Sequence, residues 1–185
     1  SELEDAERKV KELIDRLREV NRKVHEDNKR LIDELRDVNR KVAEEVRRLI
    51  EELKEVARRV DDKETVVRIV DEVLKRVEEL IEKVKRISDR VLEEVKRTVD
   101  EVKRITDKVL EDVKRLIDDV KRKTRDKRVR DRLKEVEDRV RKVVEDSRRH
   151  LEKSLREVEE VIRESREHLE EVLRRVKEEA DKIRK

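Results

Sequence analysis

The sequence predicts an all-α protein, an up-down-up antiparallel bundle of three long, nearly straight helices. The first observation behind this prediction is the composition. The 185 residues include no Gly, Pro, Cys, Met, Phe, Tyr or Trp, and 59% of them are charged. Average usage would give about 7% Gly and about 5% Pro. A chain built mainly from Glu, Asp, Lys, Arg, Val, Leu and Ile is typical of long helices and coiled coils.

The second observation is an 18-residue repeat in the apolar positions. Eighteen residues make about five turns at 3.6 residues per turn, so an apolar stripe with this period keeps its direction without supercoiling. This periodicity argues against disorder, which the high charge alone would suggest. The repeat relates residues within each third of the chain: Leu13, Leu31 and Leu49; Leu74, Leu92 and Leu110; Leu133, Leu151 and Leu169.

Two interruptions of the pattern divide the chain into helices at about 2–60, 63–123 and 127–184. Short connections between long helices produce antiparallel neighbours. We therefore expect a single three-helix bundle over residues 1–185.

Polar residues at the two interruptions are candidates for helix caps. At the first, Asp61 or Asp62 is a plausible N-cap, and Glu64 is placed for a capping box on Asp61. At the second, Thr124 or Asp126 is a plausible N-cap. Because glycine is absent, we expect a non-glycine residue to adopt the left-handed conformation that often ends a helix.

Amides, hydroxyls and imidazoles interrupt the apolar stripe at regular places. In antiparallel helices, residues whose numbers have a constant sum lie at the same height. Asn21 with Thr106 has the same sum as Asn39 with Ser88, so we expect polar layers that cross the bundle. The expected layers are Asn21, Thr106, Ser147 and His150; Asn28, Thr98 and Ser154, with His25 as a further candidate; and Asn39, Ser88, Ser165 and His168.

Such layers are expected to control the register of the helices. A buried polar group without a partner costs about 1–3 kcal/mol, so a slipped pairing that separates these groups is penalised. Apolar residues alone would let an 18-residue repeat slide by one unit. The layer around Asn28 removes this degeneracy, because Val10 and Val46 occupy the equivalent positions.

With these polar layers, the whole chain resembles de novo designed helical bundles that contain modular buried hydrogen-bond networks. The stretch Thr124–Asp131 also looks like the Thr-Asp-Pro-Lys type of hairpin loop in that class, without the proline. The resemblance implies that the chain is a synthetic structural scaffold with no natural biochemical activity and is not an enzyme. Members of the class also serve as partner-helix receptors, oligomer building blocks or pH-responsive assemblies, so a helical binding module is the alternative.

The three histidines are interpreted as structural members of the layers. A histidine buried in its neutral form has a lowered pKa, so a pH-responsive role is the second interpretation. His150 and His168 lie about 27 Å apart on one helix, and the three histidines are assigned to different layers. We therefore expect no metal site, no cofactor and no catalytic residue.

Charge and hydropathy limit the expected partners. Opposite charges are interleaved and the net charge is +3, so no strong field favours nucleic acid or a membrane. The basic segment Lys121–Arg132 contains no aromatic residue and suits a helix C-terminus and a solvated loop. No apolar run exceeds two residues, which excludes a transmembrane helix or signal peptide within the sequence. We expect a soluble chain, cytoplasmic on recombinant expression, that requires no partner, with a designed partner helix or self-association as the alternative.

Overall fold

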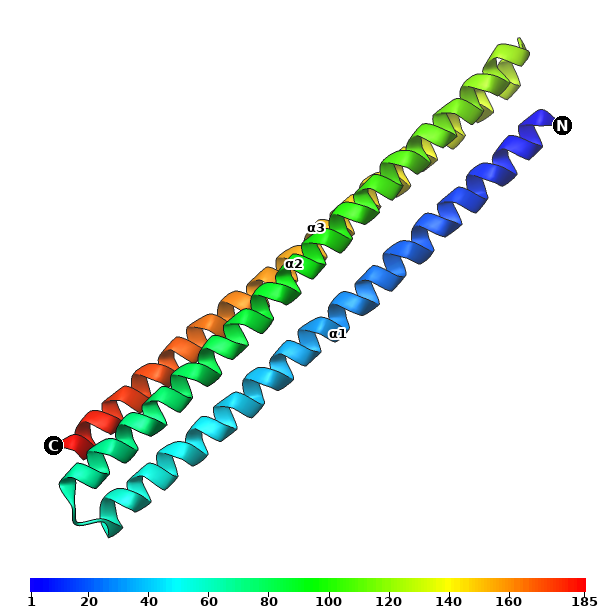
Figure 1. Ribbon diagram of the computed structural model, residues 1–185. Helices are drawn as coiled ribbons and strands as arrows, with labels where there is room; N and C mark the ends of the chain where they lie inside the picture. Colours follow the sequence, from blue (N-terminus) through cyan, green and yellow to red (C-terminus); the bar gives the residue numbers. More distant parts are fainter. The chain divides into compact units, whose positions relative to one another are not determined.

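The computed structural model describes residues 1–185 and contains three α-helices, α1 (Glu2–Arg59), α2 (Lys63–Lys123) and α3 (Lys127–Arg184). Figure 1 shows each helix as one continuous ribbon. Only the two terminal residues and the three-residue connections 60–62 and 124–126 lie outside the helices. The prediction of an all-α, three-helix fold is confirmed.

The residues fall into two compact units, and each unit contains a part of every helix. Unit 1 comprises residues 1–29 and 94–157, and unit 2 comprises residues 30–93 and 158–185. That residues 1–185 form a single bundle stays a prediction.

Contacts in unit 1 define the helix directions there. Lys123 Nζ of α2 lies 3.3 Å from Glu2 Oε1 of α1, so the end of α2 lies beside the start of α1. Arg132 Nε of α3 donates a hydrogen bond of 2.8 Å to Glu7 Oε1 of α1. In this unit α2 is therefore antiparallel to α1, and α3 begins beside the start of α1.

Unit 2 shows the antiparallel arrangement of α2 and α3. Arg166 of α3 forms an ion pair with Asp89 of α2, and Arg184 Nη1 lies 3.5 Å from Asp71 Oδ1. The residue number rises along α3 as it falls along α2, as the up-down-up topology requires.

Valine, leucine and isoleucine fill the interior of each unit at helical spacing. Leu17, Val113 and Val140 are at most 1% exposed in unit 1, and Val77 and Val176 are fully buried in unit 2. Burial of one such side chain stabilises the fold by roughly 1.5–3 kcal/mol. The buried core of unit 1 is formed by Ala6, Val10, Ile14, Leu17, Val109, Val113, Ile117, Val120, Leu133, Val140 and Val144. In unit 2 the two buried clusters are Val42, Val46, Leu49, Val77, Ile81, Val84, Leu169 and Val176, and Leu53, Val66, Val70 and Ala180.

Aspartates cap the starts of α2 and α3. Asp62 Oδ1 accepts a 3.3 Å hydrogen bond from the Glu64 amide, and Asp62 Oδ2 accepts one of 2.7 Å from Thr65 Oγ1. At the start of α3, Asp126 Oδ1 accepts a 2.9 Å hydrogen bond from the Arg128 amide. Asp62 and Asp126 are thus the N-caps among the candidates, and the capping box of Glu64 on Asp61 does not form.

The expectation that a residue at a helix end adopts the left-handed conformation was wrong, because no residue has a positive φ angle. A side chain satisfies the end of α2 instead. Arg130 Nη2 of α3 donates to the carbonyl oxygens of Lys121 and Thr124, at 3.4 Å each. At the end of α1, the Val60 amide donates a hydrogen bond of 2.9 Å to the Val56 carbonyl. This bond continues the helical pattern by one residue.

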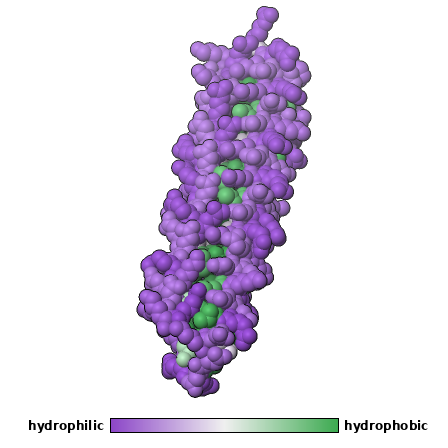
Figure 2. All heavy atoms as spheres, turned by 60° about the vertical axis from the view of Figure 1, so that its left-hand side comes forward, coloured by the Kyte–Doolittle hydropathy of each residue, from purple (hydrophilic) through white to green (hydrophobic).

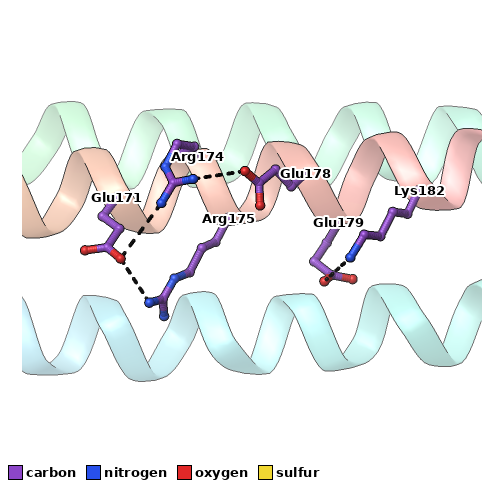
Figure 3. A network of polar contacts seen from close by, with 6 residues as sticks. All are labelled: Glu171, Arg174, Arg175, Glu178, Glu179 and Lys182. Carbon is purple, nitrogen blue, oxygen red and sulfur yellow. Dashed lines mark hydrogen bonds and ion pairs between the residues drawn. The ribbon is translucent and has the colours of Figure 1, made fainter.

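The outer faces of the helices are covered by charged side chains. The face in Figure 2 is mostly hydrophilic, with hydrophobic atoms visible in gaps between charged groups. Figure 3 shows six such side chains on α3, where Glu171 lies 3.0 Å from Arg175 and Arg174 lies 3.0 Å from Glu178. Pairs at this spacing stabilise a helix by about 0.2–0.5 kcal/mol each. None of the three helices contains an apolar stretch that is long enough to cross a lipid bilayer.

Replacing the cap of α3 tests these assignments. Asp126→Ala removes the acceptor of the Arg128 amide, and we expect the free energy of unfolding to fall by about 1 kcal/mol. Asp126→Asn keeps a side-chain acceptor, so its free energy of unfolding should fall much less. Guanidinium unfolding followed by circular dichroism measures both. The exposed Asp138 has no such bond, so an equal loss in Asp138→Ala would contradict the cap assignment.

Candidate functional site: polar pairs between α1 and α3

Two asparagine–serine pairs join α1 and α3 in unit 1. Asn21 Nδ2 donates to Ser147 Oγ at 2.5 Å, and Asn28 Nδ2 donates to Ser154 Oγ at 2.7 Å. The residues of each pair are 126 positions apart in the sequence. Because this separation is the same at both levels, α1 and α3 run parallel within the unit.

Unit 2 contains the third pair, in which the hydrogen bond runs the other way. Ser165 Oγ donates to Asn39 Oδ1 at 2.8 Å, again across a separation of 126 residues. That separation is seven times the 18-residue repeat, so equivalent positions of the repeat face each other on α1 and α3.

The Asn28–Ser154 pair is the most buried of the three pairs. Asn28 is 2% exposed and Ser154 is 6% exposed. Asn21 is half-buried, and its Oδ1 atom is buried without a hydrogen-bond partner. Of the three asparagine amides, that of Asn28 is therefore the one whose burial would cost the most free energy without a hydrogen-bond partner.

The threonines of α2 donate hydrogen bonds within their own helix rather than across the bundle. Thr106 Oγ1 donates to the Val102 carbonyl at 2.8 Å, and Thr98 Oγ1 donates to the Glu94 carbonyl at 2.9 Å. A threonine hydroxyl in a helix finds this acceptor one turn back without any ordering of a second helix. Thr98 and Thr106 were expected as members of the cross-helix layers, and in the structure both hydroxyls donate within α2 instead.

Ser88 is buried in unit 2, at 1% exposure, but no hydrogen bond joins it to Asn39 or Ser165. The polar groups of the structure thus form pairs between α1 and α3, rather than layers that include all three helices.

The expectation that His150 and His168 are buried was also wrong, because both side chains are exposed. His25, the further candidate, is exposed as well. His150 follows Ser147 by three residues and, at about 100° per residue, lies about 60° around the helix from it. A matching height therefore did not place the imidazole on the buried face. Without a buried neutral imidazole, the pH-responsive mechanism has no structural basis here.

A groove of about 430 Å³ lies between α1 and α3 beside the two pairs of unit 1. Its lining includes Asn21 and His25 of α1 and His150 and Ser154 of α3. A second groove, also of about 430 Å³, lies between the same helices and is lined by Glu7 and Arg132, among others.

Arginine–carboxylate pairs control the electrostatics around both grooves. The hydrogen bond from Arg22 lowers the pKa of the Glu19 carboxyl, and Arg22 also lies 2.7 Å from Glu26. The hydrogen bond to Glu7 raises the pKa of Arg132. Apart from the half-buried Glu7, these groups are exposed, so solvent screens them and each pair contributes little to stability.

No group of three or more His, Cys, Asp or Glu side chains is arranged to hold a metal ion. Of the residues expected in the polar layers, six are paired directly: Asn21, Asn28, Asn39, Ser147, Ser154 and Ser165. Ser88, Thr98, Thr106 and the three histidines lie outside these pairs.

Comparison with known proteins supports the fold. No protein family model and no curated protein matches the sequence. A solved structure described as "Computationally designed three helix bundle" aligns with a TM-score of 0.65 and 20% sequence identity, over 99% of this chain and 89% of that chain. At this identity the likeness shows a shared three-helix bundle fold.

The Asn28–Ser154 pair can be tested with the residues that the repeat itself supplies. Val10 and Val136 are equivalent to Asn28 and Ser154, one repeat earlier. We expect Asn28→Val or Ser154→Val alone to reduce the free energy of unfolding by about 1–3 kcal/mol, because each leaves a buried polar group unpaired. The double variant should recover most of this loss.

Guanidinium unfolding of the four proteins provides the double-mutant cycle. Additive losses in the double variant would mean that the two side chains do not interact in solution. Apolar substitutions at the less buried pair, Asn21→Leu with Ser147→Ala, provide a comparison in which partial hydration should reduce the coupling.

Proposed function

We propose that the chain is a designed structural scaffold without natural biochemical activity, in which polar pairs control how α1 and α3 associate. The observation that carries this proposal is the constant separation of the three asparagine–serine pairs, 126 residues in each case. Such agreement requires that polar residues on two helices be placed with reference to one another.

The pairs favour one register through the cost of the alternatives. If α3 were displaced by one repeat relative to α1, Asn28 would face Val136, and Ser154 would face Val46. A buried amide and a buried hydroxyl would then both lack partners, at about 1–3 kcal/mol each. The apolar contacts would be nearly unchanged, because the repeat places similar residues at equivalent positions. Among the side-chain contacts between α1 and α3, the polar pair is therefore the main source of discrimination between these two registers.

The synthetic origin in the proposal is supported by composition and by likeness. Eight residue types are missing from the 185 positions, namely Gly, Pro, Cys, Met, Phe, Tyr, Trp and Gln, and an 18-residue repeat continues through each helix. The solved structure with the same fold is described as computationally designed. The alternative, a helical binding module or building block, would use the same helices to accept a partner helix or a second copy of the chain.

Solution mass distinguishes a closed scaffold from a binding module. We expect light scattering coupled to size exclusion to give a mass near 22.6 kDa from micromolar to millimolar concentration, because the apolar faces of the three helices are covered by one another. A mass that rises toward twice this value would contradict the closed scaffold and support self-association.

The role of the polar pairs in register is tested by the same measurement on the double variant Asn28→Val/Ser154→Val. Without the pair, chains can exchange helices in displaced registers, so we expect dimers at high concentration while helical content is unchanged. Asp138→Ala is the matched surface control and should stay monomeric. A double variant that stays monomeric, with the parent's hydrogen-exchange pattern, would remove the proposed role.

A further inference from the structure

His25 and His150 line the same groove in unit 1, one from α1 and the other from α3. Both side chains are exposed. Residues 126 apart face each other across these parallel helices, and the two histidines are 125 apart. Their backbones therefore differ in height by about 1.5 Å, the rise of one residue. The assignment of these histidines to different layers placed them further apart than the structure does.

The repeat shows how close side chains at these positions come. Eighteen residues before His25 and His150 lie Glu7 and Arg132, which are also 125 apart and form a hydrogen bond of 2.8 Å. They line the second groove, whose α3 residues Arg132, Glu135, Val136 and Arg139 are each one repeat before residues that line the histidine groove. The α3 sides of the two grooves are thus equivalent in the repeat, and on α1 the equivalent lining residues are Glu7 and His25.

Two imidazoles at these positions have a shorter combined reach than a glutamate and an arginine. A metal ion between them makes up the difference, because two nitrogens at about 2.0–2.1 Å from zinc are separated by up to about 4 Å. The positions that let Glu7 and Arg132 meet directly therefore suit two histidines with one ion between them.

The charges around the groove allow a cation to enter. Arg22 is paired with both Glu19 and Glu26, at 2.5 and 2.7 Å. The remaining charged side chains of the lining are Arg18, Lys153 and Glu157. Glu19 and Glu26 lie outside the lining but pair with Arg22, so these two carboxylates and that of Glu157 balance the three basic groups of the lining.

From this arrangement we propose that His25 and His150 form a two-histidine site for a divalent transition-metal ion such as Zn²⁺ or Cu²⁺. Neutral imidazole is a preferred ligand of both ions, with Cu²⁺ bound more tightly than Zn²⁺ by a given set of ligands. Water fills the other coordination positions. The ion links α1 to α3 beside the Asn21–Ser147 pair and stabilises the association of these helices.

The chain supplies its own control for this site. One repeat after His25 and His150 lie Ala43 and His168, so that level has a single histidine. His25→Ala reproduces this arrangement at the proposed site. His168→Ala removes an exposed histidine and leaves the proposed pair intact. Both positions are exposed, so both variants should fold.

The proposal is tested by calorimetric titration of the untagged protein at neutral pH, with ZnCl₂ and separately with CuCl₂. We expect one ion per chain, an affinity at least tenfold weaker in His25→Ala and in His150→Ala, and a change within twofold in His168→Ala. Either ion should also raise the guanidinium midpoint of the parent and of His168→Ala, but not of His25→Ala, because only the folded chain brings the pair together.

Binding that is unchanged in His25→Ala, or weakened as much in His168→Ala, would mean that the ions bind single exposed histidines, and would overturn the proposal. A midpoint that the ion raises equally in His25→Ala would overturn it as well. Neither result bears on the scaffold function, which depends on the buried asparagine–serine pairs.

Discussion

The structure depends on one constraint, that a polar group removed from water must find a partner in the protein. At Asn28 and Ser154 this constraint is strongest, because both side chains are almost completely buried and bond to each other at 2.7 Å. Apolar contacts stabilise a bundle whichever similar residues meet, because dispersion and hydrophobic burial have little directionality. A buried amide distinguishes one pairing from another, since its cost is recovered only opposite an acceptor or donor.

Because of the repeat, the residues paired between α1 and α3 have the same separation in both units. Residues 126 apart meet between α1 and α3, at the two pairs of unit 1 and at the pair of unit 2. Charged pairs between α2 and α3 follow the same period, since Asp107 with Arg148 in unit 1 and Asp89 with Arg166 in unit 2 are displaced by one repeat along both helices. Exposed ion pairs contribute roughly 0–1 kcal/mol each, so they accompany the register rather than determine it.

The fold class could be predicted from sequence because helical periodicity and short connections restrict the topology strongly. The cap residues were narrowed to two candidates each, and the geometry then selected Asp62 and Asp126. The polar site was predicted less well. The expected layers matched residues by their height along the helices and not by their direction around them, and His150, which points about 60° away from Ser147, is exposed. Thr106 is fully buried, yet its hydroxyl donates to the Val102 carbonyl of its own helix. Sequence position alone does not decide this competition between a local and a distant acceptor.

The restriction of polar pairs to α1 and α3 has a physical reason in chain connectivity. The connection 124–126 joins α2 to α3 within unit 1, and the connection 60–62 joins α1 to α2 within unit 2. A three-residue connection fixes the register of the helices that it joins, because displacing them would require unwinding helical turns. No connection joins α1 to α3 directly in either unit, so the backbone relates these two helices only through α2, whereas side-chain contacts between them act on their register directly. The asparagine–serine pairs add this direct constraint to the indirect one of the connections, and the threonine hydroxyls of α2 donate within their own helix.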